Sequence, residues 1–151
     1  MSRKNNQTGN RGEFLVAAKL SEIGYSAALT LKNTPGIDIL VSNGLYAKAI
    51  QVKTCNGPKP GWPCPILKKT SKDLVFIFVN LNTKKSNIPD FYIVPSSDVR
   101  KIVKAADDEY IREHPNNSGK KGVCKFIFKT EEKEKLFKNK WNNLGLKKNE
   151  I

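Results

Sequence analysis

Two apolar segments joined through the dipeptide Asn43-Gly44 constrain the fold more than any other feature of the sequence. Segments 37–41 and 46–54 contain several β-branched residues, which favour extended structure, and Asn-Gly is the dipeptide preferred in tight hairpin turns. We therefore expect the two segments to form neighbouring antiparallel strands. A two-residue turn pairs Ser42 with Leu45, and hence Asp38 with Ala49.

The expected hairpin gathers polar side chains on one face. Side chains alternate along a strand, so Asp38 shares its face with Gln51 and Lys53. Gln51 is then a diagonal neighbour of Asp38, at roughly 7 Å between backbone positions. The opposite face carries only apolar residues: Ile37, Ile39, Val41, Ile50 and Val52. Burial of that face excludes a shift of the pairing by one residue, which would exchange the two faces; we call this choice of face the parity of the pairing. The simpler alternative is an exposed polar sheet face with an incidental charge pair.

Glu13 is the fourth polar residue of interest. Apolar spacing predicts a first helix from about Gly9 to Ile23, with Gly24 where helices usually end. On a helical wheel, Glu13 lies in the middle of the apolar face. A carboxylate in that position is costly unless it is paired or bound to a metal ion. A core glutamate paired with Arg or Lys is the alternative.

The rest of the chain predicts one mixed α/β domain over residues 1–151, with a core of about 9–115 and a C-terminal strand and helix at 120–145. Strands are expected at 26–31, 74–79, 91–94 and 123–128. Helices are expected from a Ser96 or Ser97 cap to Pro115, and from Glu131 to Gly145. The Pro- and Gly-rich segment 55–65 is expected to be a loop.

The charge of the chain points to a polyanionic partner. Lys and Arg number 27 against 14 Asp and Glu, a formal net charge of +13. The lysines are spread among apolar runs, as on the surface of a folded domain, and nucleic acid is the commonest polyanion. A generally Lys-rich protein without a binding role is the alternative.

Three cysteines without close pairs favour a reducing compartment with free thiols. A zinc site from Cys55, Cys64 and His114 would match no standard spacing. The polar N-terminus and the absence of a long apolar run predict a cytoplasmic protein without a membrane span.

The four polar residues suit metal-assisted phosphodiester hydrolysis. Mg²⁺ or Mn²⁺ prefers oxygen ligands, and Mg²⁺ keeps several waters, so few protein groups are needed. We expect Asp38 to be the main ligand, with the Gln51 side-chain oxygen and the Val52 carbonyl beside it. Lys53 would orient or deprotonate the water, and Glu13 would bind the metal directly or through water. No small-molecule cofactor is expected.

The order of these residues resembles the PD-(D/E)xK nuclease superfamily. The resemblance covers about residues 9–80 and rests on three segments: Gly12-Glu13 in a helix, Pro35-Gly36-Ile37-Asp38, and Ile50-Gln51-Val52-Lys53-Thr54. The closest branches are Holliday-junction-resolvase-like enzymes and small bacterial or phage endonucleases, including an intron-encoded homing type. It implies a restriction-endonuclease-like core, with a central mixed sheet, an N-terminal helix and flanking helices. It also implies divalent-metal-dependent cleavage of DNA.

Two departures from the superfamily pattern leave alternatives open. Gln51 stands at the second acidic position, and Pro35 stands three residues before Asp38. A nuclease fold that binds DNA without cleaving it is therefore the second hypothesis, and a basic RNA-binding protein is the third.

Further contacts to nucleic acid are expected after Lys53. Lys59 and Trp62 lie in the Pro- and Gly-rich segment and could meet a phosphate and an unpaired base, with Lys68 and Lys69 following. Covering the core is an equal alternative for Trp62. Because cutting both strands usually takes two active sites, a homodimer is attractive, with Phe137 or Trp141 as contacts.

Overall fold

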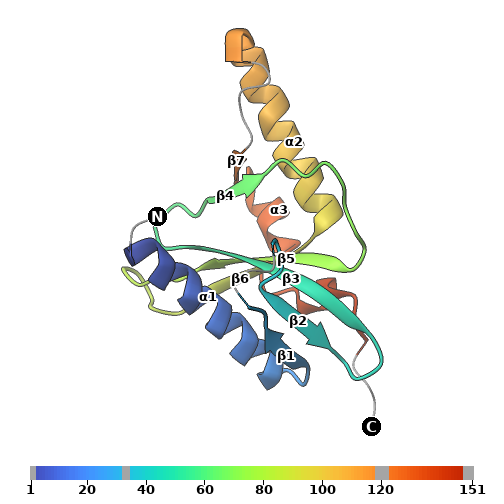
Figure 1. Ribbon diagram of the computed structural model, residues 1–151. Helices are drawn as coiled ribbons and strands as arrows, with labels where there is room; N and C mark the ends of the chain where they lie inside the picture. The colour runs from blue at the N-terminus through green and yellow to red at the C-terminus, as the bar shows by residue number, and fades with distance from the viewer. Residues whose placement is uncertain (1–2, 32–34, 118–122, 148–151) are drawn as a thin grey trace.

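A five-stranded mixed sheet forms the centre of the protein (Figure 1), in a computed structural model that describes residues 3–31, 35–117 and 123–147. Strand order is β1-β2-β3-β5-β6; β3 and β5 are parallel, and the other neighbours are antiparallel. The strands are β1 (Ser26–Leu29), β2 (Ile39–Ser42), β3 (Ala47–Cys55), β5 (Leu74–Asn80) and β6 (Asp90–Pro95). A second sheet pairs β4 (Trp62–Pro65) with β7 (Val123–Phe126). The expected α/β architecture is confirmed.

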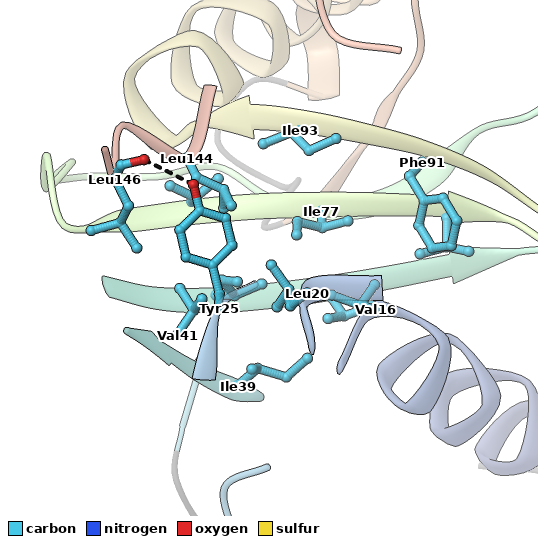
Figure 2. Close-up of a cluster of buried hydrophobic side chains, with 14 of the residues drawn as sticks. Val16, Leu20, Tyr25, Ile39, Val41, Ile77, Phe91, Ile93, Leu144 and Leu146 are labelled. Carbon is cyan, nitrogen blue, oxygen red and sulfur yellow. Dashed lines mark hydrogen bonds between the residues drawn. The ribbon is translucent and has the colours of Figure 1, made fainter. Parts of the chain in front are cut away.

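The central strand β5 is buried on both faces, which explains its continuous apolar run. Val75, Ile77 and Val79 join one apolar cluster, whereas Phe76 and Phe78 join the other. The first cluster contains Val16 and Leu20 of helix α1 (Arg3–Glu22) and is drawn in Figure 2. The second contains Val99 and Val103 of helix α2 (Ser96–Glu113), together with β4 and β7. The helices therefore cover opposite faces of the sheet.

The two long helices differ from expectation at their starts. Helix α1 begins at Arg3 instead of about Gly9. In α2 the cap position is Pro95, and Ser96 is the first helical residue. Buried Ser96 does not cap the helix: its hydroxyl donates to Ser71 O and accepts from Ser71 N. None of the helices in the described residues has the length and apolar content needed to cross a membrane.

The β2–β3 hairpin has the expected parity but a different register. The last pair is Ser42 with Ala47, so the connection has four residues instead of two. The Asn43 side-chain oxygen accepts hydrogen bonds from the N–H groups of Leu45 and Tyr46, at 3.0 and 2.7 Å. These bonds close the wider loop. Because the register shifts by an even number of residues, every side chain keeps its predicted face.

The expected loop at 55–65 is wrong at its C-terminal end. Trp62–Pro65 forms β4, which pairs antiparallel with β7. Prolines are tolerated there because the ribbon has only two strands, so one edge of each strand needs no hydrogen-bonding partner. The indole N–H of Trp62 donates to Val79 O at 2.9 Å, which anchors β4 against the central sheet.

The expected helix from Glu131 to Gly145 is also wrong. It is divided into α3 (Glu131–Lys135) and the 3₁₀ helix η2 (Trp141–Leu144). The residues between them run along the edge of β6: Ile93 N donates to Phe137 O, and Asn139 N donates to Phe91 O. Asn139 has a φ of +55°, which α-helices do not accommodate. Pairing with an open sheet edge thus replaces helical hydrogen bonds. A 3₁₀ helix, η1 (Pro115–Asn117), follows α2, and residues 120–122 of the expected C-terminal strand lie outside the described residues.

Candidate active site

Three hydrogen bonds hold Asp38, the residue that immediately precedes β2. Its N–H donates to Ile50 O at 2.8 Å, and its carbonyl oxygen accepts from Thr30 N at 2.9 Å. Its carboxylate Oδ2 accepts from the N–H of Val52 at 2.7 Å. The carboxylate is therefore fixed beside β3, with its second oxygen left out of that bond.

Gln51 and Lys53 share the sheet face of Asp38. Continuing the observed β2–β3 register by one pair sets Asp38 directly opposite Gln51, instead of diagonal to it. In the parallel pairing with β5, Gln51 lies beside Phe76 and Lys53 beside Phe78, both of which face the α2 side. All three polar side chains are half-buried. The sequence thus correctly predicts that these three residues gather on one face.

The chain before Asp38 closes one side of this group. Gly36 has a φ of +73°, and a β-carbon at Gly36 would lie 4.0 Å from Gln51 Nε2. A left-handed conformation favours glycine, so the Pro35-Gly36 pair forms a turn that approaches the Gln51 amide. The predicted motif segment therefore lies close to Gln51, one of the residues of the group that it precedes.

Lys53 points toward the second sheet. Burial raises the pKa of the Cys64 thiol to about 11, although the nearby Lys53 ammonium favours the thiolate and partly opposes this shift. Cys64 is fully buried in β4, so the Lys53 side chain extends over the α2 side of the sheet, toward β4. A cation thus stands on the same side as the Asp38 carboxylate.

Glu13 lies on the other side of the sheet. The most buried positions of α1 are Gly12, Val16 and Leu20, and Glu13 is half-buried beside them instead of central. One flank of α1 meets a groove of about 630 Å³ lined by Leu15, Lys19, Phe91 and Trp141. On the helical wheel Glu13 occupies the opposite flank, toward β2. The helix that carries Glu13 therefore packs on the α1 side of the sheet, whereas Gln51 and Lys53 face the α2 side.

The predicted nucleic-acid contacts divide into two classes. Lys59, Lys68 and Lys69 are exposed. Trp62 is 0% exposed and packs against Phe78 and Tyr92, so the structure supports its core role and corrects the expectation that it meets a base. Phe137, a predicted dimer contact, is also buried.

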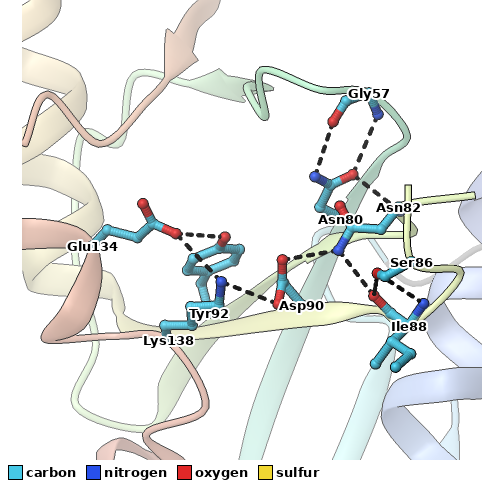
Figure 3. Close-up of polar contacts among 9 residues, drawn as sticks. All are labelled: Gly57, Asn80, Asn82, Ser86, Ile88, Asp90, Tyr92, Glu134 and Lys138. Atoms are coloured by element: carbon cyan, nitrogen blue, oxygen red, sulfur yellow. Dashed lines mark hydrogen bonds and ion pairs between the residues drawn. The ribbon is translucent and has the colours of Figure 1, made fainter. Parts of the chain in front are cut away.

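Asn80 fixes the loop that carries Lys59. Its side-chain amide donates to Gly57 O at 3.0 Å and accepts from Gly57 N at 3.3 Å (Figure 3). Asn80 is only 3% exposed and pairs with Cys55 at the end of β3. The start of the loop is therefore positioned relative to the strand that bears Gln51 and Lys53.

Thr30 and Asn80 are supporting residues that the sequence analysis misses. Besides its N–H bond to Asp38, Thr30 donates a side-chain hydrogen bond to Ile37 O. Neither residue belongs to a recognisable motif. Thr30 lies within the predicted strand 26–31 and Asn80 follows the predicted strand 74–79, and only the strand order shows which groups they reach.

The Asp38 group suits a cation that retains water. Within the described residues, no group of three or more His, Cys, Asp or Glu could hold a metal ion. Asp38 supplies one carboxylate, and Gln51 supplies an amide oxygen on the same face. Mg²⁺ is commonly held by one or two carboxylates together with waters and substrate phosphates. The donor set fits such an ion, with substrate oxygens as the remaining ligands.

Comparisons with known proteins support the fold. No protein-family model matches the chain. A glutamyl-tRNA reductase from Sulfurisphaera tokodaii is 34% identical over 99 residues, which are 66% of this chain and 23% of that protein. The chain thus spans less than a quarter of that relative's length. A solved structure of a bacterial homing endonuclease, I-Ssp6803I, superposes with a TM-score of 0.53 and 12% identity over 93% of this chain and 89% of that one. The protein therefore has a nuclease-like α/β fold.

Proposed function

We propose that the protein is a divalent-metal-dependent DNA endonuclease of the PD-(D/E)xK type. The observation that carries the proposal is the group formed by Asp38, Gln51 and Lys53 on one sheet face, with the Asp38 carboxylate held by the Val52 N–H. The fold shared with a homing endonuclease supports the same reaction class. A net charge of +13 favours a polyanionic substrate.

In this proposal each residue of the group has a separate task. Asp38 and the Gln51 amide oxygen hold Mg²⁺ or Mn²⁺, with the Val52 carbonyl and Glu13 as further candidates. The bound ion would withdraw charge from the phosphoryl oxygens of the scissile phosphate. Lys53 orients the attacking water and balances the negative charge that develops on the phosphate. The exposed residues Lys59, Lys68 and Lys69 contact neighbouring phosphates.

Cleavage of plasmid and of duplex, single-stranded and branched oligonucleotides with Mg²⁺ or Mn²⁺ tests the proposal. Asp38→Asn and Lys53→Met should each lower the cleavage rate by at least about a hundredfold, the scale of losing a charge-stabilising group. Asp108→Asn and Lys84→Met are matched controls at exposed positions and should cleave like wild type. Equal cleavage by wild type and the Asp38 and Lys53 variants would show that the site is elsewhere.

A second candidate function is DNA binding without cleavage, and Gln51 is the observation that favours it. An amide in place of a carboxylate removes one negative charge from the metal site. Such a protein would bind DNA with a steep salt dependence but would not cleave it with any divalent metal. Binding without cleavage across Mg²⁺, Mn²⁺, Co²⁺ and Ni²⁺ would favour this candidate over the endonuclease.

A further inference from the structure

A pocket of about 560 Å³ lies at the end of the sheet where β3 and β5 begin. Its walls come from the β2–β3 loop, the start of β3, the residues before β5, and the segment after η2. The charged and aromatic lining residues are Tyr46, Lys48, Lys72, Asp73 and Lys147. Three lysines and a single aspartate therefore line one space.

Lys48 is built into the wall of this pocket. Its side chain is half-buried, and Nζ donates to Lys72 O at 2.9 Å. Gly145 has a φ of +66°, and a β-carbon there would lie 2.9 Å from Lys48 Nζ. The glycine thus leaves the space that the ammonium occupies. Since an ammonium has three hydrogens, the bond to Lys72 O leaves donors for a ligand.

The charge in the pocket is unbalanced. Among the described residues, Lys48, Lys72 and Lys147 form no ion pair, and neither does Asp73. A concave surface with excess positive charge concentrates anions. The ligand that matches three lysines around one pocket is an anion with several acceptor oxygens, such as a phosphate.

We propose that this pocket binds a backbone phosphate of the nucleic acid at a distance from the Asp38 group. Lys48 precedes Gln51 by three residues on β3, about 10 Å along an extended strand, and its side chain leaves the sheet on the α1 side, opposite to that of Gln51. The phosphate in this pocket is therefore a different one from the phosphate that the Asp38 group would cleave. Only the identity of the polyanion rests on the proposed function.

Two neighbouring features extend this contact. Lys68 and Lys69 lie on the same β4–β5 connection as Lys72 and are exposed, so they add positive charge to that connection. Tyr46 is 70% exposed at the rim of the pocket. A phenol ring in that position can stack on an unpaired base beside the bound phosphate.

The test measures binding without metal, so that cleavage does not enter. Affinity for a fluorescent duplex is measured in EDTA at several salt concentrations for wild type, Lys48→Gln/Lys72→Gln and the control Lys84→Gln/Lys85→Gln. The slope of log K against log salt should fall by about 0.9 for each phosphate that the pocket variant no longer neutralises. The control should keep the wild-type slope. Lys72→Gln/Lys147→Gln alters two exposed lysines and provides a second variant that keeps Lys48 in the wall.

A titration with inorganic phosphate separates the pocket from the proposed function. Amide signals of Gly145 and Leu146 should shift in wild type and not in Lys48→Gln/Lys72→Gln. Shifts with inorganic phosphate but no affinity for DNA would retain the anion site and reject nucleic acid as its ligand. DNA binding with the expected slope but without cleavage in the metal assays would retain the pocket and reject the endonuclease. An unchanged slope in both pocket variants would overturn the proposal. So would a wild-type protein that shows neither the phosphate-induced shifts nor binding to DNA.

Discussion

The Val52 N–H donates a 2.7 Å hydrogen bond to the carboxylate of Asp38, so the candidate metal ligand is also the hydrogen-bond acceptor for a backbone N–H of β3. Asp38→Asn retains an acceptor oxygen and should have nearly wild-type stability. Asp38→Ala leaves that N–H without its partner and should cost about 1 kcal/mol or more. Urea denaturation followed by circular dichroism measures the difference. Equal stability of the two variants would contradict a structural contribution from this bond.

Restoring a carboxylate at position 51 should strengthen metal binding. Gln51→Glu adds a negative charge on the face of Asp38 and should tighten Mn²⁺ binding by about tenfold, equivalent to about 1.4 kcal/mol. Calorimetric titration of Mn²⁺ into wild type, Gln51→Glu and Gln51→Glu/Asp38→Asn measures this change. If the double variant binds as tightly as Gln51→Glu, Asp38 is not a ligand.

Gly12 allows α1 to approach β3 closely. A β-carbon at Gly12 would lie 2.9 Å from Thr54 Cβ and nearer still to Thr54 Oγ1. Gly12→Ala should therefore destabilise the protein by about 2 kcal/mol through overpacking. Thermal and urea unfolding measure this cost, which should be smaller in a Thr54→Ala background.

Gly9 provides the matched control on the same helix. A β-carbon at Gly9 would meet nothing within 4 Å. Gly9→Ala should stabilise the protein by about 0.5–1 kcal/mol, because alanine is the better helix former. Destabilisation of similar size by both alanine substitutions would attribute the Gly12 effect to the helix itself and not to Thr54.

The hairpin shows how far alternation along a strand can be trusted. Parity alone places Asp38, Gln51 and Lys53 together, because a shift of one residue would expose Ile39 and Ile50. Parity does not distinguish registers that differ by two residues. That choice depends on the Asn43 side chain, which closes a four-residue connection. The face is therefore predictable from sequence, but the direct opposition of Asp38 and Gln51 is not.

Glu13 marks the corresponding limit for helices. A helical wheel weighs apolar residues and treats glycine as neutral, yet Gly12 lies so close to Thr54 of the sheet that a β-carbon would overlap it. The contact surface is therefore turned toward Gly12, and Glu13 moves to the flank. Likewise, the break in the C-terminal helix depends on an open β6 edge, which is known only once the strand order is known.

The Cys64 thiol should make stability fall at alkaline pH. Burial raises its pKa from 9.0 to about 11, so between these pH values the unfolded chain loses a proton that the folded protein retains. The buried, protonated thiol does not lower the free energy of unfolding below pH 9. As the pH rises to about 11, the free energy of unfolding falls by about 2 kcal/mol. Urea unfolding at pH 8 to 11 should show a smaller decline for Cys64→Ala than for wild type. Parallel declines would contradict burial of the thiol.

The segment that runs along β6 does more than complete the core. Tyr92 donates to Glu134, and Lys138 forms ion pairs with Glu134 and Asp90, so side chains reinforce the backbone pairing on this edge (Figure 3). An unprotected outer strand is a template for joining other chains. Residues 137–139 occupy the hydrogen-bonding edge of β6 and thereby protect it from pairing with another chain. A chain that ends before Phe137 should expose the edge of β6 and form larger assemblies than wild type, as measured by light scattering.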